Sequence, residues 1–350
     1  MEIFTGLYAG ILGSGTDPTT LLVLGGLTMA LTMALVMAAC AVVFTWMERK
    51  VAGFIQSRYG PMRVGGWHGV AQPVADMLKI LQKEDIIPAE ADRQLFMLAP
   101  FVIFLGSLLA WAVIPFAPGF AAANLDLGLF YAFAVSGMAV IGILMAGWAS
   151  NNKWALYGAA RGAAQMVSYE IPLALAAVPV VMAVGSLNMI DITNAQAGGI
   201  AGWFLFRNPF IFVAFLIYFI SSIAEVNRGP FDLPETESEL VAGYHTEYTG
   251  MRFAFFFLAE YANLFLVSCI ATAVFLGGWH NPIPGVQIAP GLVFVAKAVF
   301  LVFMQMWLRW TLPRLRVDQL MHLCWKVLIP LALLCVIGAG IWMIATGQVG

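Results

Sequence analysis

The chain has 350 residues, of which 61% are apolar and only 10% are charged, and its formal net charge is −2 at neutral pH. An ordinary soluble domain is about 45–50% apolar and about 25% charged, so the composition excludes a water-soluble fold. The small negative charge offers no basic surface for nucleic acid, and we expect no nucleic-acid partner.

Eight apolar stretches are long enough to cross a bilayer, which requires about 20 residues per helix. We predict spans at residues 20–47, 95–117, 129–149, 158–186, 208–225, 250–276, 291–312 and 323–346. Without an internal repeat, these spans predict one all-α, polytopic membrane domain over residues 1–350. The first 48 residues contain no Lys or Arg, which a signal peptide would need, so we expect the first apolar segment to be retained.

Basic residues gather in alternate connections between these spans. The segment 48–94 holds seven Lys or Arg residues, whereas the connections on the opposite side hold only Arg207. By the positive-inside rule, the basic connections face the cytoplasm. We therefore predict periplasmic termini in a bacterial inner membrane, with the mitochondrial inner membrane as the alternative.

The first cytoplasmic connection, 48–94, is too long for a turn and contains an amphipathic pattern. Pro73 suits the first turn of a helix. The apolar residues that recur at helical spacing are Val70, Val74, Met77, Leu78 and Leu81. We predict a helix lying in the membrane interface. A surface helix without any ligand is the alternative.

Ionisable residues lie inside several predicted spans. Glu170 is about 12 residues into its span, and hence about 18 Å deep in a ~30 Å hydrocarbon core. Glu260 and Lys297 also lie within spans, and Glu225 ends one. An ionised group at such depth costs about 2.5–3.5 kcal/mol and usually marks a pathway or a partner. A neutral glutamic acid hydrogen-bonded within the bundle is the alternative.

The helix predicted around Glu170 contains a second charged residue, Arg161, and a proline, Pro172. Arg161 lies nine residues earlier, on the opposite face at about 100° per residue, so the neighbours of Glu170 must come from other helices. Pro172 can bend the helix and free backbone groups that a polar cavity would satisfy. These features together favour a polar channel.

The connection 225–252 is rich in acids. It contains six carboxylates within 23 residues and two arginines: Glu225, Asp232, Glu235, Glu237, Glu239 and Glu247, with Arg228 and Arg252. Such carboxylates repel one another, which raises the pKa of some of them toward neutrality, and a set of this kind can pass protons. A solvated acidic surface is the alternative.

Motifs for catalysis and cofactor binding are missing from the sequence. There is no GxGxxG, GxxxxGK[ST], HExxH or GxSxG, and the four cysteines and four histidines have no metal-ligand spacing. We therefore expect no flavin, metal or iron–sulfur cluster on this chain and no complete active site in this chain alone. In any redox reaction, another subunit must deliver the electrons.

Long sequence strings carry a resemblance to a known family. Residues 47–65 read MERKVAGFIQSRYGPMRVG, residues 69–84 read GVAQPVADMLKILQKE, and residues 221–261 read SSIAEVNRGPFDLPETESELVAGYHTEYTGMRFAFFFLAEY. With the spans and their orientation, these strings resemble the membrane subunit that forms the quinone site of respiratory complex I, in the family of NADH-quinone oxidoreductase H subunits. The resemblance covers nearly the whole chain except the termini and outer loops.

The resemblance implies a subunit that forms much of a quinone chamber and couples quinone reduction to proton translocation. Its substrate would be a quinone, with ubiquinone expected. Its partners would be the hydrophilic-arm iron–sulfur subunits, the small membrane-arm subunits and the lipid bilayer. Carried over by position, the quinone passage would be shaped by Glu48, Arg49, Arg58 and Asp76. Proton coupling would involve Glu170, Glu225, Asp232, Glu235, Glu237, Glu239, Glu247 and Glu260, with Arg228 and Arg252 positioning or neutralising these acids.

Three other functions fit part of the sequence. The equivalent subunit of an energy-converting hydrogenase would share the fold and differ in its electron donor. A stand-alone proton-coupled transporter also uses buried carboxylates and broken helices, but often contains an internal repeat. A structural membrane anchor would tolerate neutralisation of the acids.

Overall fold

The computed structural model describes residues 17–234, 237–283, 285 and 288–347. Within these ranges the chain is helical, and the β-structure is limited to an isolated bridge between Ala117 and Phe120. The predicted all-α class is confirmed.

Seven helical stretches are long and apolar enough to cross a membrane. They are α2 (Pro18–Ile55), α4 (Arg93–Trp111), α5 (Gly128–Ser136) with α6 (Met138–Ala149), α7 (Lys153–Val184), α12 (Gly250–Phe275), α13 (Pro290–Thr311), and α14 (Val317–His322) continued by the π-helical segment η4 (Leu323–Leu328) and α15 (Ile329–Thr346). A further helix, α10 (Pro209–Glu225), is also apolar but shorter. The prediction of about eight transmembrane helices is confirmed.

Short polar side chains begin several of these helices. Asp17 caps α2, Asp92 caps α4, Asn152 caps α7 and Asn208 caps α10, each accepting a hydrogen bond from a backbone N–H of the first turn. Such caps satisfy donors that have no partner within the helix. The helix starts are therefore fixed locally by sequence.

The end of the first span was predicted too early. A span ending at residue 47 was expected, but α2 continues to Ile55 and is 38 residues long. The extra turns begin with the good helix formers Glu48, Arg49 and Lys50, contain no proline, and include Gly53 within the helix and not at its cap, so nothing stops the helix where its apolar run ends. Glu48 and Arg49 therefore lie in the continuous helix α2.

Short elements fill the connections. They are η1 (Trp67–Gly69), α3 (Gln72–Gln82), α8 (Met189–Asn194), η2 (Ile200–Gly202), α9 (Phe204–Arg207), α11 (Glu237–Leu240) and η3 (Gly243–His245). The predicted amphipathic helix is present as α3, with Pro73 in its first turn. Val74, Leu78 and Leu81 are exposed along it, as a helix lying in the membrane interface requires.

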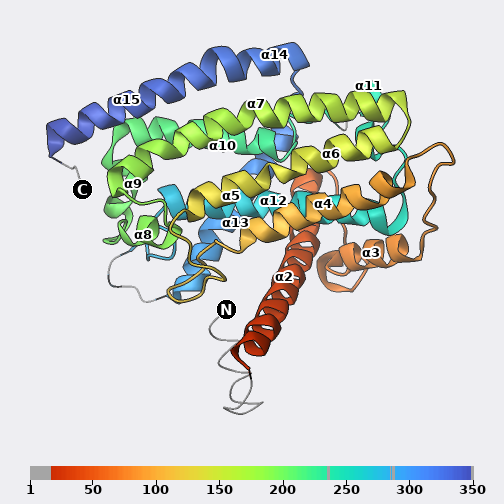
Figure 1. Ribbon diagram of the computed structural model, residues 1–350, viewed down its shortest axis with the longest axis horizontal. Helices are drawn as coiled ribbons and strands as arrows, with labels where there is room; N and C mark the ends of the chain where they lie inside the picture. The colour runs from red at the N-terminus through yellow and green to blue at the C-terminus, as the bar shows by residue number, and fades with distance from the viewer. Residues whose placement is uncertain (1–16, 235–236, 284, 286–287, 348–350) are drawn as a thin grey trace.

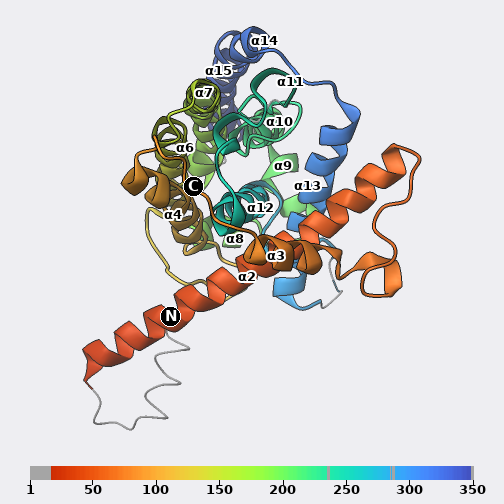
Figure 2. The ribbon, with the colours of Figure 1, turned by 90° about the vertical axis from the view of Figure 1, so that its right-hand side faces the viewer.

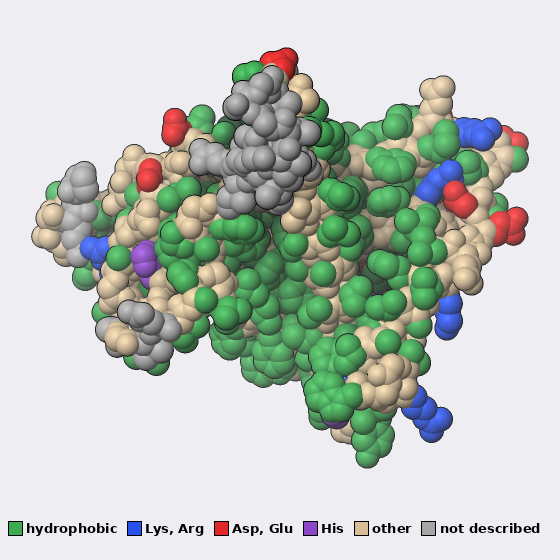
Figure 3. All heavy atoms as spheres, turned by 90° about the horizontal axis from the view of Figure 1, so that it is seen from below, with side chains coloured by type: hydrophobic (Ala, Val, Ile, Leu, Met, Phe, Trp, Pro, Cys, Tyr) green, Lys and Arg blue, Asp and Glu red, His purple; other side chains and the backbone are tan. Residues whose placement is uncertain are grey.

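Helix α12 forms the centre of the bundle, and α2 lies at its margin. In the most apolar 18-residue stretch of α12, 61% of the residues are buried, against 17% in the corresponding stretch of α2. Figure 1 shows α14, α15, α7 and α10 along one side, and Figure 2 shows the N-terminal half of α2 projecting obliquely from the bundle. From below, apolar side chains cover most of the surface, and most of the visible Lys and Arg lie near one end (Figure 3).

Candidate functional site

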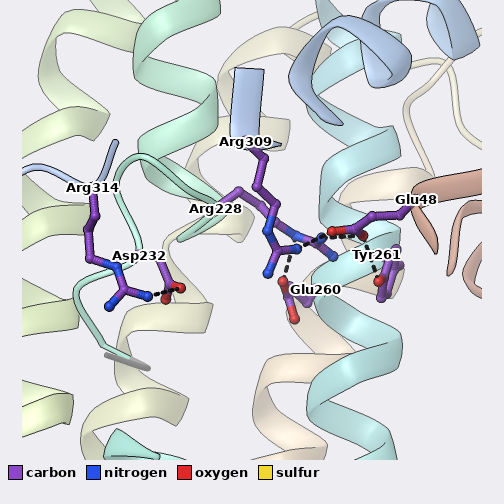
Figure 4. A network of polar contacts seen from close by, with 7 residues as sticks. All are labelled: Glu48, Arg228, Asp232, Glu260, Tyr261, Arg309 and Arg314. Atoms are coloured by element: carbon purple, nitrogen blue, oxygen red, sulfur yellow. Dashed lines mark hydrogen bonds and ion pairs between the residues drawn. The ribbon is translucent and has the colours of Figure 1, made fainter. Parts of the chain in front are cut away.

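A buried ionic network lies where α2, α12, α13 and the loop after α10 meet (Figure 4). The guanidinium Nη1 of Arg228 donates to Glu48 Oε2 at 2.6 Å, and its Nε lies 2.6 Å from Glu260 Oε1. The hydroxyl of Tyr261 donates to the same Glu48 oxygen at 2.7 Å. The guanidinium of Arg309 pairs with Glu48 Oε1. Two carboxylates and two guanidinium groups therefore balance one another.

Burial makes this pairing obligatory. The side chains of Arg228 and Glu48 are only 3% and 6% exposed. Burial lowers the pKa of Arg228, but the carboxylates of Glu260 and Glu48 outweigh this effect and raise it well above its ordinary value. The guanidinium also lies 4.2 Å from the ring centroid of Tyr261. Arg228 is thus a permanent cation whose counter-charges are both protein carboxylates.

A passage formed by two adjoining hollows leads from the edge of the bundle to this network. One hollow of about 230 Å³ lies between α2, α3 and α12, and a second of about 240 Å³ borders the network. Both are lined by Thr45, Arg49, Phe257 and Tyr261, so they adjoin one another. The first is mostly apolar and the second is lined by several charged groups.

Arg49 and Asp76 pair at the wall of the first hollow. Gln72 Nε2 donates to Asp76 Oδ1 at 2.9 Å, and Arg49 donates to the other carboxylate oxygen. Burial raises the pKa of Asp76, but the hydrogen bonds from Arg49 and Gln72 outweigh it, and the net pKa is lowered. This ion pair ties α3 to α2.

A small hollow on the other side of Glu260 leads toward further acids. It has a volume of about 30 Å³, and its lining includes Glu225, Glu260, Asn227 and Asn263. Glu225 Oε2 and Asn263 Oδ1 are buried without a hydrogen-bond partner. A polar hollow of this size holds about one water molecule, which would satisfy both atoms. Glu260 therefore borders the passage and the small hollow alike.

Glu170 lies next in this direction. Its carboxylate lies against Gly137, where α5 gives way to α6, and an added Cβ at Gly137 would be 3.2 Å from Glu170 Oε1. Glu170 also interacts electrostatically with Glu225. Glu170 and Glu225, from different helices, are thus close enough to interact electrostatically.

The other acids of the connection 225–252 have separate partners. Asp232 pairs with Arg314 at 3.0 Å, Glu239 pairs with Arg161 at 2.6 Å, and Asn152 Nδ2 donates to Glu247 Oε1 at 2.7 Å. These contacts attach the loop to α7 and to the residues before α14. They do not form one cluster in the described residues.

The predicted site residues are only partly grouped as expected. Glu48 was expected with the quinone passage and Arg228 with the proton-coupling acids, but the two form one pair. Arg58 lines the second hollow, whereas Arg252 pairs with Asp85 at 3.1 Å instead of one of the expected acids. Glu235 lies outside the described residues, and Glu237 is placed only as the first residue of α11.

Sequence reasoning missed Tyr261 and Arg309. Tyr261 directly follows an intramembrane acid, and Arg309 lies in the last turn of α13. Their contacts with Glu48 join residues 213 and 261 positions apart. A search for polar residues next to intramembrane acids would have found Tyr261, and a search for basic residues in the last turn of a span would have found Arg309.

Lys297, predicted inside a span, binds the connection that follows α12 at one end of the bundle. Its Nζ donates to the carbonyls of Leu276, Gly278 and His280 at 2.8, 2.9 and 2.8 Å. The ammonium also lies 4.6 Å from the ring centroid of Trp203. Its three N–H donors are therefore all in use, which assigns it to structure.

A larger hollow offers no charged group. It has a volume of about 530 Å³ and lies between the outer parts of α2, α12 and α13, lined by residues such as Trp111, Phe116 and Phe265. No Asp, Glu, Lys or Arg is among its lining residues in the described part of the chain. Of these hollows, the passage beside Glu48 is the one that combines apolar walls with fixed charges.

Comparison with known proteins gives consistent matches over the whole bundle. The NADH dehydrogenase family matches residues 27–340. The NADH-quinone oxidoreductase H subunit of Chlorobium luteolum is 56% identical over 310 residues, covering 85% of this chain and 83% of the relative. The H subunit of Geobacillus sp. strain WCH70 is 50% identical over 325 residues, covering 93% and 95%. That of Anaeromyxobacter dehalogenans is 44% identical over 365 residues, covering 97% and 88%.

Proposed function

The chain belongs to the NADH dehydrogenase family, as a relative of NADH-quinone oxidoreductase H subunits, and from this premise we propose that it forms much of a quinone chamber and couples quinone reduction to proton translocation. Its partners are the hydrophilic-arm iron–sulfur subunits, which deliver electrons, and the small membrane-arm subunits. The observation that best supports this role is the buried network of Glu48, Arg228 and Glu260 at the inner end of the passage.

The passage suits a lipid-soluble quinone. Quinone reaches it laterally from the bilayer, because the outer hollow is mostly apolar and lies between α2, α12 and the amphipathic α3. The headgroup then advances along Arg49 and Tyr261 toward the charged second hollow. Ubiquinone is the quinone we expect. The hollow of about 530 Å³ would give the headgroup no charged contact from the described residues.

Glu260 connects the passage to the deeper acids. A quinone takes up electrons and protons together, and the charge change in the second hollow acts on an ion network that is shielded from water. A shift of Arg228 toward the passage weakens its pairing with Glu260, which favours protonation of that carboxylate. The proton equilibrium then extends through the water-sized hollow to Glu225 and on to Glu170. The small membrane-arm subunits receive the effect.

The orientation follows from charge. We expect the ends near α3, α11 and α14 to face the cytoplasm and both termini to face the periplasm, because the basic residues gather in those connections. The expected location is the bacterial inner membrane, as a multi-pass subunit.

The test uses Glu260→Gln in membranes that contain the whole complex, after assembly has been verified. NADH oxidation by a water-soluble acceptor should be unchanged, whereas quinone reduction and proton pumping should fall at least tenfold. Glu84→Gln is the matched control, because Glu84 is an exposed carboxylate outside the network and outside the proposed coupling acids. Full pumping in the Glu260→Gln complex would refute the coupling role.

A further inference from the structure

Two proline-interrupted helices meet side by side in the bundle. Helix α7 contains Pro172, and the run from α14 to α15 contains Pro330. Figure 1 shows this run lying along α7, and residues of α7 contact both η4 and α15. The irregular part of each helix faces the other.

Pro172 leaves a backbone carbonyl of α7 without its helical donor. In an α-helix the carbonyl of Ser168 would accept from the N–H of residue 172, but proline has none. The thiol of Cys324 lies against this carbonyl, with a distance of 3.0 Å from Sγ to the oxygen. Cys324 is fully buried and Ser168 is 4% exposed, so water does not satisfy the carbonyl instead.

Pro330 accounts for the position of Cys324. In a regular α-helix its ring would clash with the carbonyl of Lys326 and leave that carbonyl without a donor. The chain instead widens into the π-helical η4 directly before the proline, and Ile329 N–H donates to the carbonyl of Cys324. Such widened turns often mark functional places in helices. One of the six residues of η4 is the thiol donor.

A second hydrogen bond strengthens the contact. The hydroxyl of Tyr169 donates to the carbonyl of Leu320 at 2.9 Å, and both residues are fully buried. Side chains of each helix therefore satisfy carbonyls of the other. The turn of α7 around Pro172 is held from the side of α14 and η4.

The same turn of α7 presents Glu170 on another face. Glu170 directly follows Tyr169, lies against Gly137 and interacts electrostatically with Glu225. A change in the bend at Pro172 would move this carboxylate. We propose that the thiol of Cys324 is a positioning residue that keeps Glu170 in place by occupying the freed carbonyl of Ser168. The inference rests on the proposed coupling role of Glu170.

The hydrogen bond can be separated from packing by three substitutions. Cys324→Ser keeps a donor, Cys324→Val fills the site without one, and Cys324→Ala removes the side chain beyond Cβ. Cys335→Ala is the matched control, because Cys335 is also buried in the same helical run. All four are made in the whole complex, together with Glu170→Gln.

The measurement is the number of protons pumped per NADH oxidised, and its dependence on pH. We expect Cys324→Val and Cys324→Ala to lower this ratio at least twofold and to displace its pH profile, whereas Cys324→Ser and Cys335→Ala retain both. An unchanged ratio and profile in Cys324→Val and Cys324→Ala would overturn the inference. So would a complex that assembles only with a donor at this position, because the contact would then be structural alone.

The outcome for Glu170→Gln distinguishes a failure of the coupling role of Glu170 from a failure of the positioning role of Cys324. If Glu170→Gln leaves pumping unchanged, the proposed coupling role of Glu170 is wrong. If it abolishes pumping while all Cys324 variants pump normally, only the positioning role of Cys324 is wrong.

Discussion

The guanidinium of Arg228 and the carboxylate of Glu48 form a buried pair at 2.6 Å, although they are 180 positions apart in the sequence. Glu48 belongs to α2, which is otherwise the least buried of the candidate spans. The pair therefore attaches a marginal helix to the centre of the bundle, and it does so at the wall of the passage.

Removal of Arg228 should destabilise the subunit strongly. Arg228→Met would leave Glu48 and Glu260 buried with fewer counter-charges, and breaking a buried ion pair costs about 3–5 kcal/mol. We expect reduced assembly and a lower midpoint of thermal unfolding for the complex. Arg314→Met is the control, because its more exposed pair with Asp232 should contribute only about 0–1 kcal/mol. Equal losses from both substitutions would contradict this account.

A methyl group at Gly137 should disturb the acid beside it. In Gly137→Ala the new Cβ would lie 3.2 Å from Glu170 Oε1, closer than ordinary contact, so the carboxylate must move. We expect quinone reduction to be retained while proton pumping falls severalfold, measured in the same membranes. In Gly340→Ala the new Cβ would approach the flexible end of Met182 at the same distance, 3.2 Å. That control should pump normally; a similar loss in both variants would point to general packing.

The attachment of α3 should weaken in acid. The pKa of Asp76 is lowered from its ordinary value of 3.8 by the hydrogen bonds from Arg49 and Gln72, which outweigh the opposing effect of burial. The stabilisation is therefore fully present above about pH 4 and disappears as the pH falls through the lowered pKa. Asp76→Asn should remove this pH dependence and make α3 more accessible to protease at neutral pH.

Proteolysis of the solubilised complex between pH 3 and pH 7 would measure this effect. Glu84→Gln is the control, since Glu84 lies just beyond α3 and no salt bridge involves it in the described residues. An identical acid response in wild type and Asp76→Asn would exclude Asp76 as the titrating group.

Loss of the Lys297 ammonium should loosen the outer end of the bundle. Lys297→Met would leave the carbonyls of Leu276, Gly278 and His280 without this donor, and each unsatisfied buried carbonyl costs about 1–3 kcal/mol. We expect a lower thermal midpoint but normal proton pumping per NADH in complexes that assemble. Lys326→Met is the control, because Lys326 is exposed in η4, and it should have little effect on either quantity. A specific loss of pumping in Lys297→Met would show that the residue has a further role.

The stability of this end of the bundle should also depend on pH, through a histidine that the fold keeps neutral. Burial lowers the pKa of His280 from its ordinary value of 6.5, and the neighbouring Lys297 lowers it further. The fold therefore favours the neutral ring, and this stabilisation is lost as the pH falls from 6.5 through the lowered pKa. In Lys297→Met, the pKa of His280 should be lowered less, so the acid-induced loss of stability should be smaller and should end at a higher pH.

Sequence reasoning located the helices well because each span is an apolar run of sufficient length. It failed at the end of α2, since bilayer thickness limits the apolar run but does not stop the helix. The same reasoning placed Glu170 and Glu225 inside or at the end of spans, and both are there. Local patterns were sufficient for these features.

The pairing within the site could not be predicted in the same way. Glu48 contacts Arg228, Tyr261 and Arg309, which come from three distant parts of the chain. Nothing in the spacing of a single helix encodes such contacts. The loop 225–252 was expected to act as one acidic group, but its arginine and asparagine partners lie on α7 and near α14, and they separate the described acids.

The clamp at Lys297 also constrains where charge can cross the membrane. Because all of its N–H groups are bound to carbonyls, this lysine is a fixed positive charge with no free site for an incoming proton. The membrane potential acts on it, but the ammonium cannot relay protons while these bonds last. The proposed proton route through Glu260, Glu225 and Glu170 therefore bypasses this lysine, whose bonds hold α13 to the residues that follow α12.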